Sequence, residues 1–173
     1  MEFIVDMKDD QLVIKYDDSK LKAIKKSLVQ GTNRHIRIGW LNKRKYQAKG
    51  KNKGLTIAQV ASWTEFGTKH NYPRPHLSIT MGSIKKDMNP YFDEYFKALL
   101  KCQNGSDVLQ KINKMSVKKY KDTVKRQGFR SLSPITIKLK GHDTILINTG
   151  KMVDNFESKT YKTNIHNMDK RAR

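Results

Sequence analysis

The side chains best suited to acid–base chemistry or metal binding are scattered along this chain. Its five histidines are His35, His70, His76, His142 and His166. None stands at metal-ligand spacing from another histidine, a cysteine or an acid, and the closest approach to a zinc pattern is His70 and His76, six residues apart across a proline-rich loop. His142-Asp143 has the composition of a nuclease acid–base pair, but phosphodiester hydrolysis usually needs a metal held by several carboxylates. We therefore expect ordinary surface or loop histidines and no bound metal.

Carboxylates are too few and too dispersed for a hydrolytic site. The chain has 16 Asp and Glu, and none lies between Ser19 and Thr64. Asp93 and Glu94 are adjacent, so they point to different faces of a helix and do not form a shared reaction centre. A place near a helix start, where the dipole favours negative charge, explains them more simply. We predict no catalytic residue and no cofactor, and expect that the protein is not an enzyme.

Three further motifs have structural explanations. Gly50-Lys51-Asn52-Lys53-Gly54 resembles a phosphate-binding loop but lacks the Gly-Lys-Ser/Thr ending of a nucleotide site. Cys102 is the one cysteine, which excludes a disulfide framework, and we expect it to be a buried structural thiol. Asn148-Thr149-Gly150 is typical of a tight turn, because Asn and Gly tolerate positive φ.

The basic arm, residues 42–54, is the strongest candidate for a functional surface. Its cations are Lys43, Arg44, Lys45, Lys49, Lys51 and Lys53, and its aromatic residue is Tyr46. Lysines that neutralise phosphates beside an aromatic ring that can stack are how sequence-independent nucleic-acid contacts are built. Two other interpretations stay open. The arm is either a solvated loop with almost nothing to bury, or it contacts an acidic face of a neighbouring subunit, such as the N-terminal strands from Glu2 to Asp18.

Charge is the strongest compositional signal. The net charge is +20 over 173 residues, and six of the 16 acids lie in the first 18 residues. Such a field favours an acidic partner: nucleic acid, a membrane surface or an acidic protein face. No apolar run approaches the roughly 20 residues needed to span a bilayer, and the acidic, alternating N-terminus is not a signal peptide. We expect a soluble protein without a membrane partner, made in a cytoplasm.

Periodicity predicts the elements that position these residues. Helices are expected at 19–31, 56–66, 75–88, 89–100 and 106–127, and whether the third and fourth form one kinked helix stays open. Strands or extended segments are expected at 2–6, 11–16, 34–41, 129–139, 144–147 and 156–161, with a turn or single helical turn at 149–154. The predicted fold class is α+β, with a small mixed or antiparallel sheet packed by several helices. We predict a single domain over residues 1–161, which includes the basic arm, and a basic C-terminal tail over 162–173.

The segment 55–77 has the composition of a rigid scaffold. Thr56 can cap a helix whose apolar stripe includes Ile57 and Ala61, and Gly67 can supply a left-handed stop. Pro73-Arg74-Pro75 then stiffens the entry to the next helix. None of these residue types is arranged to do chemistry.

This segment resembles the small neck and tail-completion proteins of tailed bacteriophages, often filed as virion morphogenesis or minor tail proteins. The matching residues are Ile57, Ala58, Val60, Ala61, Glu65, Phe66, Gly67, Thr68, Arg74 and Pro75. A second block resembles the same family through Lys138-Leu139-Lys140-Gly141, Leu146 and Asn148-Thr149-Gly150-Lys151-Met152. The family commonly has Phe where His76 stands and Asp where Asn148 stands, so details of pocket and turn need not transfer.

The resemblance implies a structural virion protein of the head-to-tail neck or tail end, synthesised in the host bacterial cytoplasm. It implies a homo-oligomeric ring, with six copies expected, that contacts the phage connector, tail terminator or tail tube proteins, and DNA in the channel is a further possible contact. The implied assembly motif is Phe66, Gly67, Thr68, Pro73, Arg74, Pro75, Asn148, Thr149 and Gly150. In it, Phe66 is expected to plug the core and Arg74 to make a fixed hydrogen bond to a carbonyl or carboxylate. The alternative left open is a non-catalytic nucleic-acid-binding module that uses the 43–53 arm.

Overall fold

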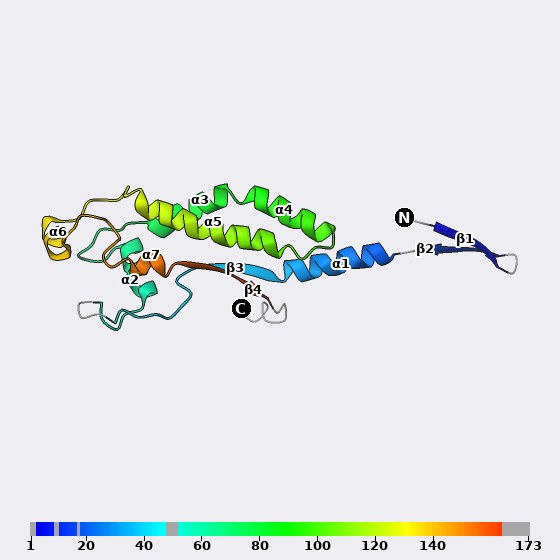
Figure 1. Ribbon diagram of the computed structural model, residues 1–173, viewed down its shortest axis with the longest axis horizontal. Coiled ribbons are helices and arrows are strands. Elements are labelled where there is room, and N and C mark those ends of the chain that lie inside the picture. Colours follow the sequence, from blue (N-terminus) through cyan, green and yellow to red (C-terminus); the bar gives the residue numbers. More distant parts are fainter. Residues whose placement is uncertain (1–2, 9–10, 17, 48–51, 164–173) are drawn as a thin grey trace.

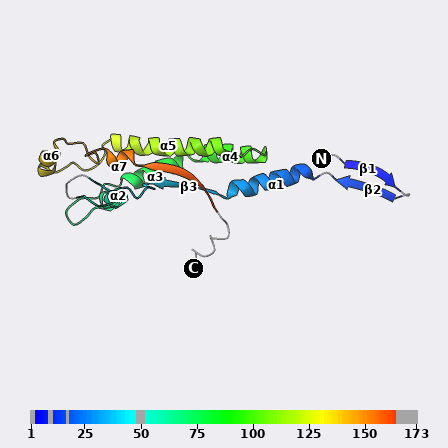
Figure 2. The ribbon, with the colours of Figure 1, turned by 60° about the horizontal axis from the view of Figure 1, so that its bottom comes forward.

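The computed structural model describes residues 3–8, 11–16, 18–47 and 52–163. It is elongated (Figure 1). A hairpin of β1 (Phe3–Lys8) and β2 (Gln11–Tyr16) lies at one end, and α1 (Ser19–Thr32) connects it to the rest of the chain. α2 (Ile57–Phe66), α6 (Pro134–Lys140) and α7 (Lys151–Asp154) lie at the opposite end, and the turned view in Figure 2 shows the same separation.

The predicted α+β class is confirmed, although the strands do not form one sheet. β1 pairs with β2, and β3 (Arg34–Gly39) pairs with β4 (Glu157–Lys162), both antiparallel. The sequence also predicts a turn at Lys8-Asp9-Asp10 between these two strands, and its residues 9–10 lie outside the described residues. α3 (His76–Lys86), α4 (Asn89–Leu100) and α5 (Ser106–Lys125) complete the body, so the open question about 75–100 resolves as two helices. No helix of the described chain is both long and apolar enough to cross a membrane.

The main core forms where α5 crosses the β3–β4 pair. Tyr120 of α5 and Phe156 stack with ring centroids 3.8 Å apart, and the ring of Trp40 meets both edge-on, at 5.6 and 5.3 Å. A second cluster between α4 and α5 contains Tyr95, Leu99, Val108, Leu109 and Ile112, and Leu28 of α1 packs against it. The helix predicted over 106–127 is α5, and its buried residues Val108, Ile112, Ser116, Tyr120 and Val124 recur every four positions on the face that packs in these clusters.

Gly31 does not end its helix as predicted. α1 continues to Thr32, and Gly31 is buried inside it. A Cβ placed there would lie 2.3 Å from Leu99 Cδ1, so the missing side chain is what allows α1 to approach α4 closely.

Two predicted extended segments are wrong. Residues 134–140 form α6 instead, because the Ser133 side chain accepts a hydrogen bond from the Thr136 N–H (3.2 Å) and Pro134 occupies the first turn. Residues 144–147 form a turn rather than a strand. There the Gln127 side chain accepts from the Ile145 N–H (2.5 Å) and donates to the Ile145 carbonyl (3.1 Å), which satisfies the backbone groups that a strand would pair.

Candidate functional site

The connection from α2 to α3 is built as the sequence predicts. Thr56 Oγ1 accepts from the Gln59 N–H (3.2 Å) while Gln59 Oε1 accepts from the Thr56 N–H (2.9 Å), which completes a capping box. The helix ends at Gly67, whose φ is 78°. A Cβ at this glycine would lie 2.8 Å from the Asn71 carbonyl oxygen and 2.9 Å from Pro73 N, so both the turn and the proline require glycine here.

Glu65 joins the two helices through a buried carboxylate, 5% exposed. It accepts hydrogen bonds from the Leu77 N–H (2.7 Å), the Ser78 N–H (2.9 Å) and Ser78 Oγ (2.5 Å). The carboxylate at the end of α2 therefore caps the beginning of α3. The Arg74 N–H also donates to the Thr64 carbonyl at 2.8 Å, which fixes the loop between them. The sequence matched Glu65 to a motif but assigned it no role.

His76 is fully buried, so the expectation of an ordinary surface or loop histidine is wrong for this residue. Its Nε2 lies 3.1 Å from Thr64 Oγ1 and 3.8 Å from Glu65 Oε2, and its ring meets those of Trp40 and Tyr120 edge-on. Burial lowers the pKa of His76, and the carboxylate of Glu65 only partly offsets this effect. The histidine is therefore neutral at pH 7.

The group formed by Thr64, Glu65, His76 and Ser78 is hereafter the polar junction. Burial alone would raise the pKa of Glu65, but hydrogen bonds from the Ser78 hydroxyl and from the Leu77 and Ser78 amides hold that pKa below its ordinary value. Ser78 Oγ donates to the carboxylate and not to the imidazole. This order differs from a nucleophile–base–acid relay, in which histidine lies between the hydroxyl and the carboxylate. The polar junction is arranged as a structural cap.

A cavity of about 480 Å³ adjoins the polar junction. Its cations are Lys53, Arg74, Lys140 and Lys151, and no Asp or Glu is among its described lining residues. The rest of the lining is Tyr46, Asn52, Val60, Thr64, Leu132, Thr136, Leu139, Leu146, Ile147, Asn148, Thr149, Gly150 and Met152. The cavity, hereafter the cationic cavity, thus brings together residues from both blocks that resemble the phage family.

Two cations of the cationic cavity, Arg74 and Lys140, are each held by a backbone carbonyl and lie close enough to affect each other. Arg74 Nε donates to the Arg130 carbonyl at 3.3 Å, which is a contact of the kind predicted for Arg74, and Lys140 Nζ donates to the Thr144 carbonyl. Burial lowers the pKa of Lys140, and Arg74 lowers it further, while Asp143 has the opposite effect. Burial and the neighbouring Arg130 likewise lower the pKa of Arg74. These positive charges are therefore less well stabilised than solvated ones.

Other predicted motif residues lie at the surface. Phe66 is 77% exposed, so its predicted role as a core plug is wrong: the preceding residue, Glu65, takes the buried face, and successive side chains on a helix point about 100° apart. Thr68 pairs with Asn71 across the turn. Pro73, Pro75, Asn148 and Thr149 are exposed. The sequence predicted a turn in which Asn148 and Gly150 tolerate positive φ. Gly150 has a φ of 73°, but Asn148 is not at positive φ, whereas Leu146 has a φ of 62°.

The described parts of the basic arm, residues 42–47 and 52–54, are held to the rest of the chain by backbone hydrogen bonds. The Tyr46 N–H donates to the Leu55 carbonyl and the Gly54 N–H to the Tyr46 carbonyl, both at 2.9 Å. The Tyr46 ring packs against the cluster of Ile57, Ala61 and Met152, so it is not free to stack on a base as the sequence suggested. Lys43, Arg44, Lys45 and Lys53 are exposed, and Lys49 and Lys51 lie outside the described residues.

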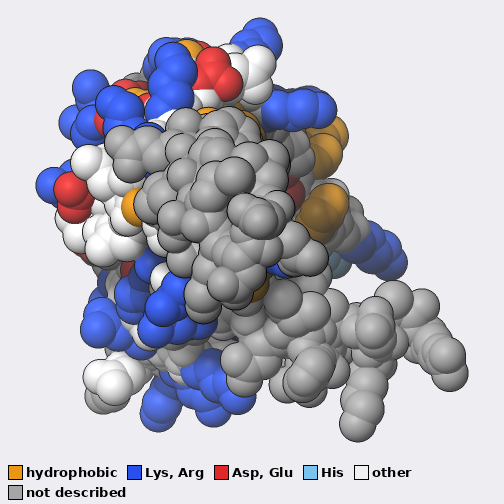
Figure 3. Space-filling model, turned by 90° about the vertical axis from the view of Figure 1, so that its right-hand side faces the viewer, with side chains coloured by type: hydrophobic (Ala, Val, Ile, Leu, Met, Phe, Trp, Pro, Cys, Tyr) orange, Lys and Arg blue, Asp and Glu red, His pale blue; other side chains and the backbone are white. Residues whose placement is uncertain are grey.

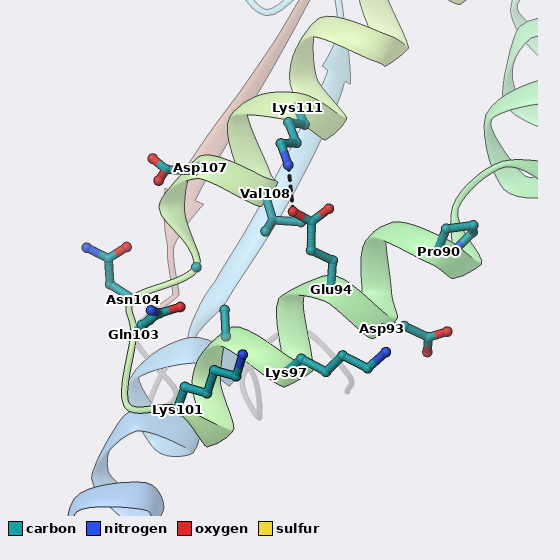
Figure 4. Close-up of a pocket in the computed structure, with 12 residues that line it drawn as sticks. Pro90, Asp93, Glu94, Lys97, Lys101, Gln103, Asn104, Asp107, Val108 and Lys111 are labelled. Carbon is teal, nitrogen blue, oxygen red and sulfur yellow. Dashed lines mark hydrogen bonds and ion pairs between the residues drawn. The ribbon is translucent and has the colours of Figure 1, made fainter.

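A larger groove of about 1070 Å³ lies between α4 and α5 (Figure 4). Glu94 points toward Lys111, with 2.5 Å between Oε1 and Nζ, while Asp93 points away from it. The two acids therefore lie on different faces, as predicted, but they follow the first turn of α4, so the predicted interaction with the helix start is wrong. Cys102, at the end of this helix, is exposed with a φ of 60°, and the predicted buried thiol is also wrong.

In the described part of the chain, no group of three or more His, Cys, Asp and Glu residues is placed to hold a metal ion. Comparison with known proteins adds no assignment. No protein-family model matches the chain, and no curated protein and no solved structure matches it either. The function is therefore inferred from the geometry of the polar junction and the cationic cavity, and from the sequence motifs.

Proposed function

We propose that this protein is a structural component of a phage virion, at the head-to-tail neck or the tail end. Copies assemble as a ring, with six copies expected, that joins the head connector to the tail or completes the tail. The observation that most supports this is that residues of both motif blocks lie together, at the α2–α3 connection and in the cavity beside it. Glu65 and Gly67 fix the α2–α3 connection, and Arg74, which follows from it, lines the same cavity as residues 148–152.

This construction suits a building block better than an enzyme. The carboxylate of Glu65 is buried and already accepts three hydrogen bonds, so it is not available to a substrate. Rigid helix connections of this kind hold surfaces at fixed angles, which a ring of identical subunits requires. In this proposal the protein catalyses no reaction and works through contacts with its own copies and with adjoining proteins.

Exposed apolar side chains provide surfaces for such contacts. Trp63 and Phe66, three residues apart, share one face of α2, and Ile135 and Leu139, four apart, share one face of α6. Their exposed fractions are 46%, 77%, 73% and 81%, which is unusual for large apolar residues on two neighbouring elements. Both helices lie at the end of the molecule away from the hairpin (Figure 1). In this proposal that end faces the adjoining neck or tail protein.

Mass spectrometry of purified particles tests the proposed function most directly. The chain is expected in mature virions at the copy number of a ring. Its absence from particles that are complete and infectious would contradict the proposal. A second test is Arg74→Ala in the phage, which is expected to yield filled heads and separate tails by electron microscopy. Arg126→Ala, which removes an exposed arginine at the end of α5, is the matched control and is expected to leave joining intact.

A non-catalytic nucleic-acid-binding module is the second candidate, favoured by the exposed run Lys43-Arg44-Lys45 and the net charge of +20. Such a module binds duplex DNA with an affinity that falls steeply with salt, since each neutralised phosphate releases counterions. Replacing Lys43 and Lys45 by Gln would reduce the slope of log K against log salt by about 1 per lysine. A neck protein is expected to show weak binding to free DNA and to sediment with virions.

A further inference from the structure

The two ends of this molecule differ in charge. Residues 1–18 contain six acids and two lysines, out of 16 acids and 36 Lys and Arg in the chain, so this segment is negative and the remainder is strongly positive. Figure 3 views the molecule from the hairpin end, and the described side chains on that face are mainly Lys and Arg with few acids. The acidic segment is therefore the exception in an otherwise basic protein.

The β1–β2 hairpin of the acidic segment and the cationic cavity of one copy lie at opposite ends of the molecule. The hairpin is joined through α1, and α1 packs on α4 (Figures 1 and 2). The cavity is formed by residues of α2, α6, α7 and the loops next to them, at the far end of the body. Within one copy the two could meet only if α1 left its packing on α4. In the folded protein, a contact between them therefore joins two copies, head to tail.

The cationic cavity has the properties of a binding site for carboxylates. Arg74 and Lys140 are partly buried close together, and both have pKa values lowered by burial and by a neighbouring cation. An incoming carboxylate would offset both effects, because charged hydrogen bonds in a partly dry site are stronger than those at the surface. Exposed lysines elsewhere on the molecule are solvated and screened by salt, so their interaction with a carboxylate is much weaker.

The size and lining of the cavity favour a peptide over a nucleic acid. A volume of about 480 Å³ lies within the range of sites that enclose a small ligand, so it accommodates a few side chains of a turn but not a double helix. Apolar residues line it beside the cations, including Val60, Leu139 and Leu146. Such a mixed lining suits a peptide segment that combines acids with apolar residues, as MEFIVDMKDD does.

We propose that the acidic N-terminal segment of one copy, residues 1–18, docks in the cationic cavity of a second copy through Arg74, Lys140 and Lys151. Repetition of this head-to-tail contact closes the ring. The inference rests on the proposed function for its place in the virion, but the contact itself is a property of the purified protein.

Reciprocal charge reversal tests the contact in the full-length chain. The cavity variant is Lys140→Glu with Lys151→Glu, and the segment variant is Asp9→Lys with Asp10→Lys. The matched control is Lys97→Glu with Lys101→Glu, two exposed lysines in α4 and at its C-terminal cap. Sedimentation velocity at low and high salt measures self-association. Wild type and control are expected to associate in low salt and to dissociate as salt rises. The cavity and segment variants are each expected to associate about tenfold or more weakly.

Restored association is the decisive result. In an equimolar mixture, the intact segment of the cavity variant can bind the intact cavity of the segment variant. The lysine-bearing segment can also bind the glutamate-bearing cavity, so complexes are expected to return. Their return also shows that both variants are folded, and circular dichroism provides an independent check. Wild-type self-association by both variants, no recovery in the mixture, or a wild type that stays monomeric would each overturn the inference.

The two proposals fail in different ways. If the chain is found in virions at ring stoichiometry while both variants assemble normally, the head-to-tail contact is wrong and the virion role stands. If the variants behave as expected but the chain is absent from particles, the contact stands and the virion role is wrong. Loss of duplex-DNA binding by the cavity variant, with self-association unchanged, would assign the cavity to phosphate and overturn the peptide contact.

Discussion

The polar junction and the cationic cavity lie next to each other and share Thr64, yet they treat buried charge in opposite ways. In the polar junction, the carboxylate of Glu65 accepts three hydrogen bonds within 2.9 Å and meets a helix start. In the cationic cavity, Arg74 and Lys140 repel each other and no acid lines the space among its described residues. The first arrangement stabilises the fold, whereas the second costs stability and is expected to serve an external partner.

The largest effect is expected from removing the carboxylate of the polar junction. Glu65→Ala leaves the partly buried Leu77 and Ser78 N–H groups without their acceptor, and it creates a cavity beside His76. We expect a loss of about 3 kcal/mol in the free energy of unfolding, measured by urea denaturation. Asp93→Ala on the exposed face of α4 is the control and is expected to change it by less than about 0.5 kcal/mol. Equal effects of the two variants would show that the carboxylate does not connect α2 to α3.

The turn that brings the two helices together is the next most sensitive point. Gly67→Ala places a Cβ 2.8 Å from the Asn71 carbonyl oxygen in a backbone with φ of 78°. We expect a loss of about 2 kcal/mol, since both the clash and the positive φ oppose the side chain. Gly82→Ala lies within α3 where nothing is within 4 Å of the added Cβ, and it is expected to stabilise by up to about 1 kcal/mol. Thermal unfolding of both variants provides the measurement. Equal midpoints for Gly67→Ala and Gly82→Ala would mean that the turn accommodates a side chain by changing its backbone conformation.

Local signals in the sequence predicted the elements that local contacts determine. The predicted cap at Thr56 and stop at Gly67 depend on residues a few positions away, and α2 begins and ends at them, while the structure adds Gln59 to the cap. For α6, the alternation of Ile135, Ile137 and Leu139 indicated a strand. The helix-start signal of Ser133 and Pro134 predicted this segment better than the alternation did. A strand here would need a partner strand, and β3 is described as paired with β4.

The candidate site could not be predicted in the same way, because its residues come from separate segments. His76 is buried by Trp40 and Tyr120, which are 36 and 44 residues away in the chain. The cationic cavity draws Lys53, Arg74, Lys140 and Lys151 from different elements, and none of these cations is unusual in its own local sequence. Only the resemblance of both motif blocks to one family linked these regions before the structure did.

Acidification provides a smaller test of the polar junction. The folded pKa of His76 is lowered by burial, so below the ordinary value of 6.5 the unfolded chain binds a proton that the folded chain does not. The free energy of unfolding is therefore expected to fall as pH drops from 6.5, by at most about 1.4 kcal/mol per pH unit from this group. The lowered pKa of Glu65 adds a loss only below about its ordinary value of 4.5.

His76→Phe separates these two contributions. It keeps an aromatic ring between Trp40 and Tyr120 but removes the titrating group, so the decline between pH 6.5 and 5 is expected to shrink while the decline below pH 4.5 remains. His70→Phe, in the exposed turn after Gly67, is the control and is expected to leave the profile as in wild type. An unchanged decline in His76→Phe would place its origin in another group. Urea denaturation at a series of pH values provides the measurement.

The smallest effect on stability, and the sharpest contrast with Glu65, is expected in the cationic cavity. Lys140→Met keeps the apolar stem of the side chain and removes a charge that burial and Arg74 both disfavour. This gain is offset by the lost hydrogen bond to the Thr144 carbonyl, so the free energy of unfolding is expected to stay within about 0.5 kcal/mol of wild type. Self-association in low salt is nevertheless expected to weaken, whereas Lys138→Met, an exposed neighbour on α6, is expected to change neither quantity. A large destabilisation by Lys140→Met would mean that this charge supports the fold as the carboxylate of Glu65 does, and the cavity would then have no need of an acidic partner.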